Sequence, residues 1–169
     1  IIDASKLDGS FGGSQYVSLV PAGEKTVRIS TGSNYHLQQD LTYVIISSDN
    51  GKLKISNKKV IKEKYGNESI AIIKDFDTNT FYLVAYDKLE KLHYLYKYDV
   101  ATESFIAKDT IDSFMEVAER NGEPILMGTI KASPNGKFIV STNAESYNGV
   151  EVIKFDRITE KLELIKTFN

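Results

Sequence analysis

Few residues of this sequence could carry out chemistry, and the two histidines come first. His36 and His93 are too few for a histidine-rich metal site. No short motif marks a serine nucleophile, a phosphate-binding loop or a zinc protease. An isolated histidine in a strand usually packs or faces solvent. We therefore expect His93, in the apolar segment 92–98, to be structural, and we predict no catalytic residue.

Acidic side chains give two further candidates. The segment Asp75-Phe76-Asp77-Thr78-Asn79 has oxygen-bearing side chains at alternate positions, like the start of a calcium loop. Such a loop needs glycine at its sixth position and an acid at its twelfth, where this chain has Thr80 and Tyr86. A turn held by side-chain hydrogen bonds is the better interpretation. Asp87 and Glu90 could be a glycosidase pair, but nothing fixes their separation. We predict no metal site and no cofactor.

Aromatic side chains form the first candidate binding surface. Tyr94, Tyr96 and Tyr98 alternate along one predicted strand and would share a face of it. An exposed tyrosine ladder could stack on sugars or on a peptide, whereas a covered one would pack between neighbouring sheets. We predict a binding surface here if the face is exposed.

Lysines form the second candidate surface. Lys52 and Lys54 begin a basic run that continues through Lys58, Lys59, Lys62 and Lys64 and is opposed only by Glu63. The run could contact an anionic polymer. A solvated strand face, whose lysines keep sheet edges from associating, is the better interpretation.

Composition limits the class of protein. The 169 residues suit one domain with a real core, and a net charge of −2 argues against a nucleic-acid-coating protein. The absence of cysteine excludes disulfides and thiol chemistry. No apolar run is long enough for a membrane span. Since the chain opens on Ile1 rather than Met, we expect a piece of a larger protein.

Strands must position these residues. Two segments, 43–46 and 52–55, are joined through Asn50-Gly51, the strongest hairpin signal in the chain. The apolar runs 69–74 and 80–85 indicate strands buried on both faces. Residues 111–120 fit either a short helix ending at Asn121-Gly122 or a twisted strand.

One strand design occurs twice, 57 residues apart. Each copy has an apolar strand, a loop, a strand ending in an aromatic residue and aspartate, a turn carrying Thr-Glu, and a further strand; the copies include Tyr98-Asp99 with Thr102-Glu103, and Phe155-Asp156 with Thr159-Glu160. The pattern predicts an all-β fold of antiparallel four-stranded meanders. We expect an irregular segment with one or two strands at 1–40, and about three blade-like repeats at 41–169. Two repeats start near Ile70 and Gly128, and an earlier copy runs from about Leu41 to Lys64.

The segment Ser133-Pro134-Asn135-Gly136-Lys137 before an apolar strand resembles the inner-strand start of WD40-like propeller repeats. The continuation to Phe155-Asp156 and Thr159-Glu160-Lys161-Leu162 resembles blades of large secreted β-propeller proteins from Bacteroidetes. The resemblance covers roughly residues 41–168 and implies propeller-like blades. The chain has no Trp-Asp pair, and three copies are too few to close a ring, so the resemblance implies a partial propeller or fragment.

These patterns predict a non-enzymatic binding or scaffolding module of a larger bacterial surface or secreted protein. We expect a protein or glycan partner, further blades from the rest of the chain, and no nucleic acid or membrane insertion in this segment. The expected location is secreted or in the cell envelope, with the cytoplasm left open. Two alternatives remain: part of a propeller-type enzyme, such as a lyase or glycoside hydrolase, and a sensor ectodomain. Carboxylates and a histidine meeting at one end of the sheets would favour the enzyme.

Overall fold

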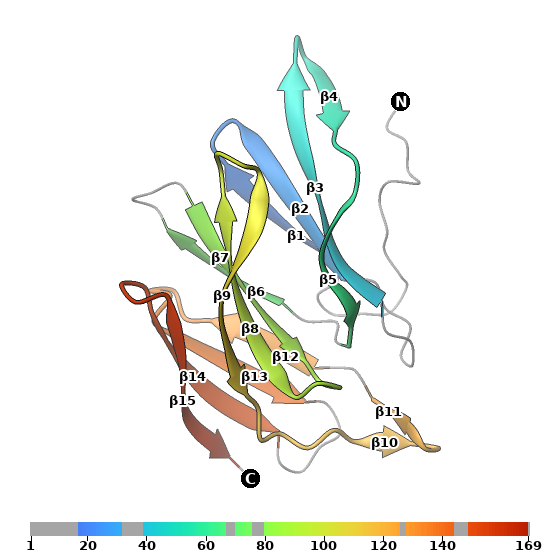
Figure 1. The fold of residues 1–169 in the computed structure, drawn as a ribbon, viewed down its shortest axis with the longest axis vertical. Coiled ribbons are helices and arrows are strands. Elements are labelled where there is room, and N and C mark those ends of the chain that lie inside the picture. Colours follow the sequence, from blue (N-terminus) through green and yellow to red (C-terminus); the bar gives the residue numbers. More distant parts are fainter. Residues whose placement is uncertain are drawn as a thin grey trace.

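Three large β-sheets lie one above another in the computed structural model of the chain (Figure 1). The structure describes residues 17–31, 39–66, 70–75, 80–125, 128–143 and 149–168. These residues form fifteen strands and no helix, which confirms the all-β prediction. No helix that could cross a membrane is found among them.

The first sheet holds five antiparallel strands. They are β1 (Val17–Ala22), β2 (Lys25–Thr31), β3 (Gln39–Asp49), β4 (Lys52–Ile55) and β5 (Lys59–Tyr65). β3 pairs with both β4 and β5, and β1 and β2 extend the same sheet on its other side. Asn50 and Gly51 both have positive φ, 50° and 74°, in the β3–β4 turn, so the Asn-Gly hairpin is confirmed. The first sheet thus begins before Leu41, because β2 pairs with β3 along its length.

The middle sheet is a four-stranded meander. Its strands are β6 (Ile70–Asp75), β7 (Thr80–Asp87), β8 (Leu92–Asp99) and β9 (Ser104–Asp112). Every residue of β7 is buried, as the unbroken apolar run predicts, because this strand has another sheet on each side.

The helix, one of the two structures expected for residues 111–120, is not formed. β9 continues to Asp112, residues 113–118 have no regular structure, and a two-stranded hairpin follows, β10 (Glu119–Arg120) with β11 (Glu123–Pro124). Met115 is fully buried while Phe114 is mostly exposed, so the two do not share one covered face. The Phe114 amide donates to the Glu151 carboxylate instead of to a helical carbonyl.

The third sheet repeats the meander. Its strands are β12 (Gly128–Ala132), β13 (Phe138–Asn143), β14 (Val150–Asp156) and β15 (Lys161–Phe168). The predicted starts of the two four-stranded sheets, near Ile70 and Gly128, are confirmed.

The repeat extends to local geometry. Asp99 accepts hydrogen bonds from the Ala101 amide and the Thr102 hydroxyl, and Asp156 accepts from two amides of its own turn. Glu103 and Glu160 occupy matching left-handed positions, with φ of 52° and 54°. The last two strands of each sheet pair with a register shift, which lies at Leu95/Tyr96 between β8 and β9 and at Val152/Ile153 between β14 and β15. The two sheets are therefore copies down to their turns and bulges.

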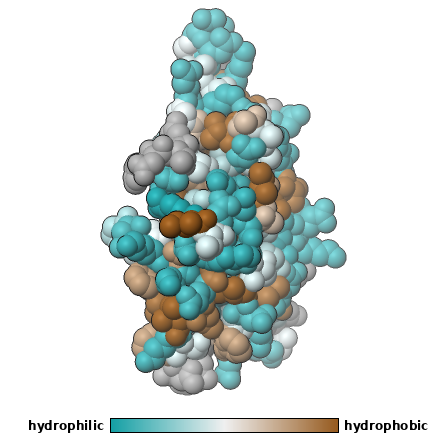
Figure 2. Space-filling view, turned by 60° about the vertical axis from the view of Figure 1, so that its left-hand side comes forward, coloured by the Kyte–Doolittle hydropathy of each residue, from teal (hydrophilic) through white to brown (hydrophobic). Residues whose placement is uncertain are grey.

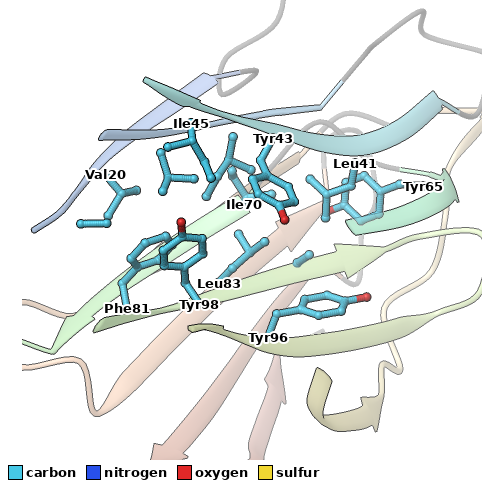
Figure 3. Close-up of a cluster of buried hydrophobic side chains, with 14 residues drawn as sticks. Val20, Leu41, Tyr43, Ile45, Tyr65, Ile70, Phe81, Leu83, Tyr96 and Tyr98 are labelled. Atoms are coloured by element: carbon cyan, nitrogen blue, oxygen red, sulfur yellow. The ribbon is translucent and has the colours of Figure 1, made fainter. Parts of the chain in front are cut away.

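Two apolar cores share the middle sheet. One lies between the first and middle sheets and includes Tyr43, Phe81, Leu83 and Tyr98 (Figure 3). The other lies between the middle and third sheets and includes Tyr82, Val84, Met115, Ile139 and Phe155. Alternate residues of β7 serve the two cores, because successive side chains of a strand point to opposite faces.

Candidate functional site

The predicted tyrosine ladder lies between sheets. Tyr96 and Tyr98 are buried in the core that joins the first and middle sheets, and Tyr98 stacks on Phe81 with ring centroids 4.9 Å apart. In Figure 3 the Tyr98 ring points toward the strands of the first sheet, and the Tyr96 ring lies along its own strand on the same side of the middle sheet. Aromatic packing between sheets, the alternative to a binding surface, describes these two residues. Only Tyr94, the third member of the ladder, is partly exposed.

Tyr94 belongs to a charged group that we call the Lys62 cluster: Lys62, Asp87, Glu90 and Tyr94. The Lys62 ammonium lies 4.9 Å from the centroid of the Tyr94 ring and 3.0 Å from Glu90 Oε1. Its distance to Asp87 Oδ2 is 3.6 Å. The Tyr94 hydroxyl donates to Glu90, and this bond, with Lys62, holds the pKa of Glu90 below its usual range. The ring face of Tyr94 is thus occupied by a cation.

Asp87 is fixed by its turn. The buried Asp87 carboxylate accepts hydrogen bonds from the amides of Leu89 and Glu90, at 3.1 and 3.3 Å. The neighbouring Lys88 is also buried, and its ammonium donates to the Ile125 carbonyl at 3.3 Å. Asp87 therefore closes the β7–β8 turn, and the idea of a free glycosidase pair with Glu90 gains no support from this geometry.

The predicted lysine surface lies on the first sheet. Lys52 and Lys54 are exposed on β4, and Lys54 pairs with Asp49 across the hairpin. Farther along the run, the Lys59 ammonium donates to the Glu103 carbonyl at 3.2 Å and lies over the Tyr43 ring. Part of the basic run thus joins the first sheet to the middle sheet, while its start stays in solvent.

A buried polar group joins the middle and third sheets. We call it the His93 cluster: His93, Glu151, Ser113 and Tyr86. His93 Nε2 lies 2.7 Å from Glu151 Oε2, and both side chains are fully buried. The Ser113 hydroxyl donates to the same oxygen at 2.9 Å, and the Phe114 amide donates to Oε1 at 2.6 Å. The His93 ring stacks on Tyr86, with centroids 4.5 Å apart.

Electrostatics keep Glu151 ionised. Burial acts to raise the pKa of Glu151, but the hydrogen bond from His93, the Phe114 amide and Ser113 outweigh burial and lower it. An ionised carboxylate only accepts hydrogen bonds, so His93 donates through Nε2–H. His93 Nδ1 and Ser141 Oγ are buried without a hydrogen-bond partner among the described residues.

The order of contacts differs from that of a catalytic triad. In a triad the histidine lies between the nucleophile and the acid, whereas Ser113 and His93 here both bond directly to Glu151. Nothing in the cluster therefore activates the serine. The arrangement can hold two sheets in register, and His93 proves packed, as the sequence suggests.

Sequence reasoning missed Glu151 and Ser113. Glu151 lies on β14 between valines and shares the buried face of Ile153 and Phe155. An acid at an inward position of an alternating strand is a signal of a buried partner, which the sequence alone does not identify.

No group of side chains suited to a metal ion occurs in the described part of the chain. Residues 76–79 of the proposed calcium-like turn lie outside the described residues.

Two open cavities lie at the strand ends that are farther from the Lys62 and His93 clusters. One of about 420 Å³ lies between the β12–β13 and β14–β15 turns and is lined by Lys137, Phe138, Lys154 and Arg157 among others. Another of about 450 Å³ lies beside the β8–β9 turn and includes Thr80, Asp99 and Lys108. On the side of the molecule that Figure 2 shows, the surface is mainly hydrophilic with separate apolar patches.

Comparison with known proteins identifies the fold. No protein-family model matches the chain, and no curated protein matches it. Among solved structures, a Lactobacillus plantarum protein aligns over 92% of this chain and 41% of its own, with 19% identity and a TM-score of 0.58. A proposed 6-phosphogluconolactonase from Bacteroides fragilis aligns over 89% and 37%, with 14% identity and a TM-score of 0.54. An exo-β-1,3-galactanase from Phanerochaete chrysosporium aligns over 90% and 35%, with 11% identity and a TM-score of 0.52.

These neighbours are propeller-type proteins, so the sheets of this chain are propeller-like blades. The chain spans about two fifths of the length of these structures. The identities are too low to carry function, and neither WD40 repeats nor a Bacteroidetes family is indicated by the matches.

Proposed function

We propose that this chain is a non-enzymatic binding or scaffolding module within a larger propeller-type protein. One observation carries the proposal. The one histidine–carboxylate pair in the described residues, His93 with Glu151, is fully buried and joins two sheets. A reacting group must meet its substrate, and this pair meets only protein. The partner would be a protein or a glycan.

Surface chemistry supports binding. The described residues expose several large apolar side chains that a partner could cover, including Phe138, Val140 and Ile158. From the blade resemblance we further infer a secreted or cell-surface bacterial protein, with additional blades supplied by the rest of the polypeptide.

A turnover assay tests this function. The purified chain is incubated with 6-phosphogluconolactone and with β-1,3-galactotriose, chemistries taken from the neighbours' names. We expect no turnover above the buffer rate. Turnover that disappears in Glu90→Gln, while Glu163→Gln keeps it, would overturn the proposal.

A propeller-type enzyme is the second candidate. One observation favours it: the Lys62 cluster and the His93 cluster, with their three carboxylates and one histidine, lie at the same ends of the middle-sheet strands, where β7 ends and β8 begins. Glu90 would be the accessible acid, because its side chain is 44% exposed. The same assay decides between the two candidates, since the enzyme requires turnover that depends on Glu90.

A further inference from the structure

The outer face of the third sheet, which points away from the middle sheet, carries an exposed apolar stripe between lysines. Val140 pairs across the strands with Lys131 and Val152, and Phe138 pairs with Lys154. Directly paired residues share a face. Phe138 is 44% exposed and Val140 40%, whereas Ile139, on the other face of β13, is fully buried against the middle sheet.

The middle sheet shows what covers such a face. There Tyr82 pairs with Lys97 and Val84 with Leu95, and Lys97 lies two residues before Asp99, as Lys154 lies two before Asp156. Strand pairing therefore matches Tyr82–Lys97 with Phe138–Lys154. Tyr82 and Val84 are buried, and the third sheet covers them.

Glu160 holds the third sheet to the middle sheet through hydrogen bonds and ion pairs. Glu160, in the Thr-Glu turn of the third sheet, accepts hydrogen bonds from Lys97 at 2.6 Å and from the Tyr82 hydroxyl at 2.8 Å. Its other oxygen lies 2.7 Å from Lys108. These cations and the phenol, against the opposing effect of burial, lower the pKa of Glu160 to about 2.

The same fastening occurs one sheet earlier. Glu103, the matching residue of the middle sheet, forms an ion pair with Lys25 of the first sheet. Its carbonyl accepts from the Tyr43 hydroxyl at 3.0 Å. Twice, then, a Thr-Glu turn reaches back to a lysine and a tyrosine of the preceding sheet. Within the described part of the chain, the ion pair of Lys154 is an exposed one within its own sheet, with Glu163 at 3.3 Å.

We propose that the outer face of the third sheet docks a further four-stranded sheet of the same repeat design, supplied by the same protein, whose turn glutamate binds Lys154. The inference rests on the proposed scaffolding function and names its partner. The docked sheet covers Phe138, Val140 and Val152 with an apolar face like that of Ile139 and Ile153. The lysines at 131, 154 and 166 favour an acidic edge on that sheet.

A thiol-labelling experiment tests the docking. The chain has no cysteine, so Val140→Cys provides a single reporter, and Leu53→Cys, exposed on the first sheet, provides the matched control. Each is placed in the 169-residue chain and in an extended chain with a second copy of residues 113–168 after Asn169. We expect labelling at position 140 to be at least about tenfold slower in the extended chain, and labelling at position 53 to be unchanged.

A double-mutant cycle tests the fastening in the extended chain. Lys154→Gln and the Glu→Gln change in the appended Thr-Glu turn should couple about three- to tenfold in the unfolding constant, as Lys97→Gln and Glu160→Gln should. Unchanged labelling at position 140, or no coupling at Lys154, overturns the proposal. Slow, concentration-dependent labelling in the 169-residue chain also overturns it, because a second copy would then cover the face. The turnover assay is independent, so failure of the function is distinguished from failure of the docking.

Discussion

At the residue scale, Glu151 is a buried acid that links the third sheet to the middle sheet. The fully buried carboxylate receives hydrogen bonds from His93, Ser113 and the Phe114 amide. Removing the charge leaves these donors with a weaker acceptor in a site closed to water, and buried groups that lose a partner pay their desolvation cost.

Glu151→Gln should therefore lower the free energy of unfolding by about 2–4 kcal/mol at neutral pH. Urea denaturation measures it, with exposed Glu163→Gln expected to change by no more than about 0.5 kcal/mol. Because the folded pKa of Glu151 is lowered, its contribution is complete above the unfolded pKa of 4.5 and is lost as pH falls through the folded value. The gap between wild type and variant should shrink in acid. Equal losses in both variants would contradict this role.

Glu160 gives a second residue-scale prediction. Its pKa of about 2, against an ordinary 4.5, means that its stabilisation is complete above pH 4.5 and is lost progressively as the pH falls from 4.5 through 2. Glu160→Gln should cost about 1 kcal/mol at pH 7, because the carboxylate is partly exposed, and clearly less near pH 2, where about half of the carboxylate is protonated. Denaturant unfolding followed by circular dichroism at the two pH values measures this. Exposed Glu119→Gln is the control, and a pH-independent cost would argue against the ion pairs.

At the element scale, turns decide how closely the sheets approach. Gly136, in the β12–β13 turn, has φ of 67°, and a Cβ there would lie 2.6 Å from Ile73 Cγ2 of the middle sheet. Gly51, in the β3–β4 turn, has φ of 74° with nothing within 4 Å of the same position. The two glycines share a backbone conformation and differ in their neighbours.

Gly136→Ala should cost about 2–3 kcal/mol, combining left-handed strain with displacement of Ile73, whereas Gly51→Ala should cost only about 1 kcal/mol of strain. Thermal unfolding of the two variants gives the comparison. Equal costs would mean that the turn accommodates the methyl group without moving Ile73.

The sequence predicts elements better than it predicts their partners. The runs from Ile70 and Thr80, the Asn50-Gly51 turn and the paired Thr-Glu turns are local patterns, and each is found in the structure. The segment after Asp112 was not predictable, because a tertiary hydrogen bond to Glu151 takes the place of helical ones. His93 and Glu151 lie 58 positions apart, so no local pattern pairs them.

At the scale of the whole molecule, the middle sheet links both cores. Leu83 and Val84 are adjacent in β7 and fully buried, one in each core. A loss in either core should therefore weaken the whole molecule, since the sheet between them serves both.

Leu83→Ala should lower the free energy of unfolding by about 2–5 kcal/mol, with the amide signals of β2 and β14 lost at one denaturant concentration. NMR-monitored urea titration follows both strands in one experiment. Val84→Ala removes a smaller volume than Leu83→Ala, so it should lower the urea midpoints of both strands together, by a smaller amount. Separate midpoints for β2 and β14 would show that the sheets unfold independently.

The complete burial of β7 has a consequence before folding is finished. Residues 80–85 form a run of β-favouring, uncharged side chains, the composition that promotes cross-β association between chains. In the native molecule a sheet on each side covers this strand, and the first charges beyond it are Asp87 and Lys88. A chain that has lost either neighbouring sheet exposes one side of the run to other chains. We therefore expect the strand that belongs to both cores to be a segment through which partly folded molecules associate.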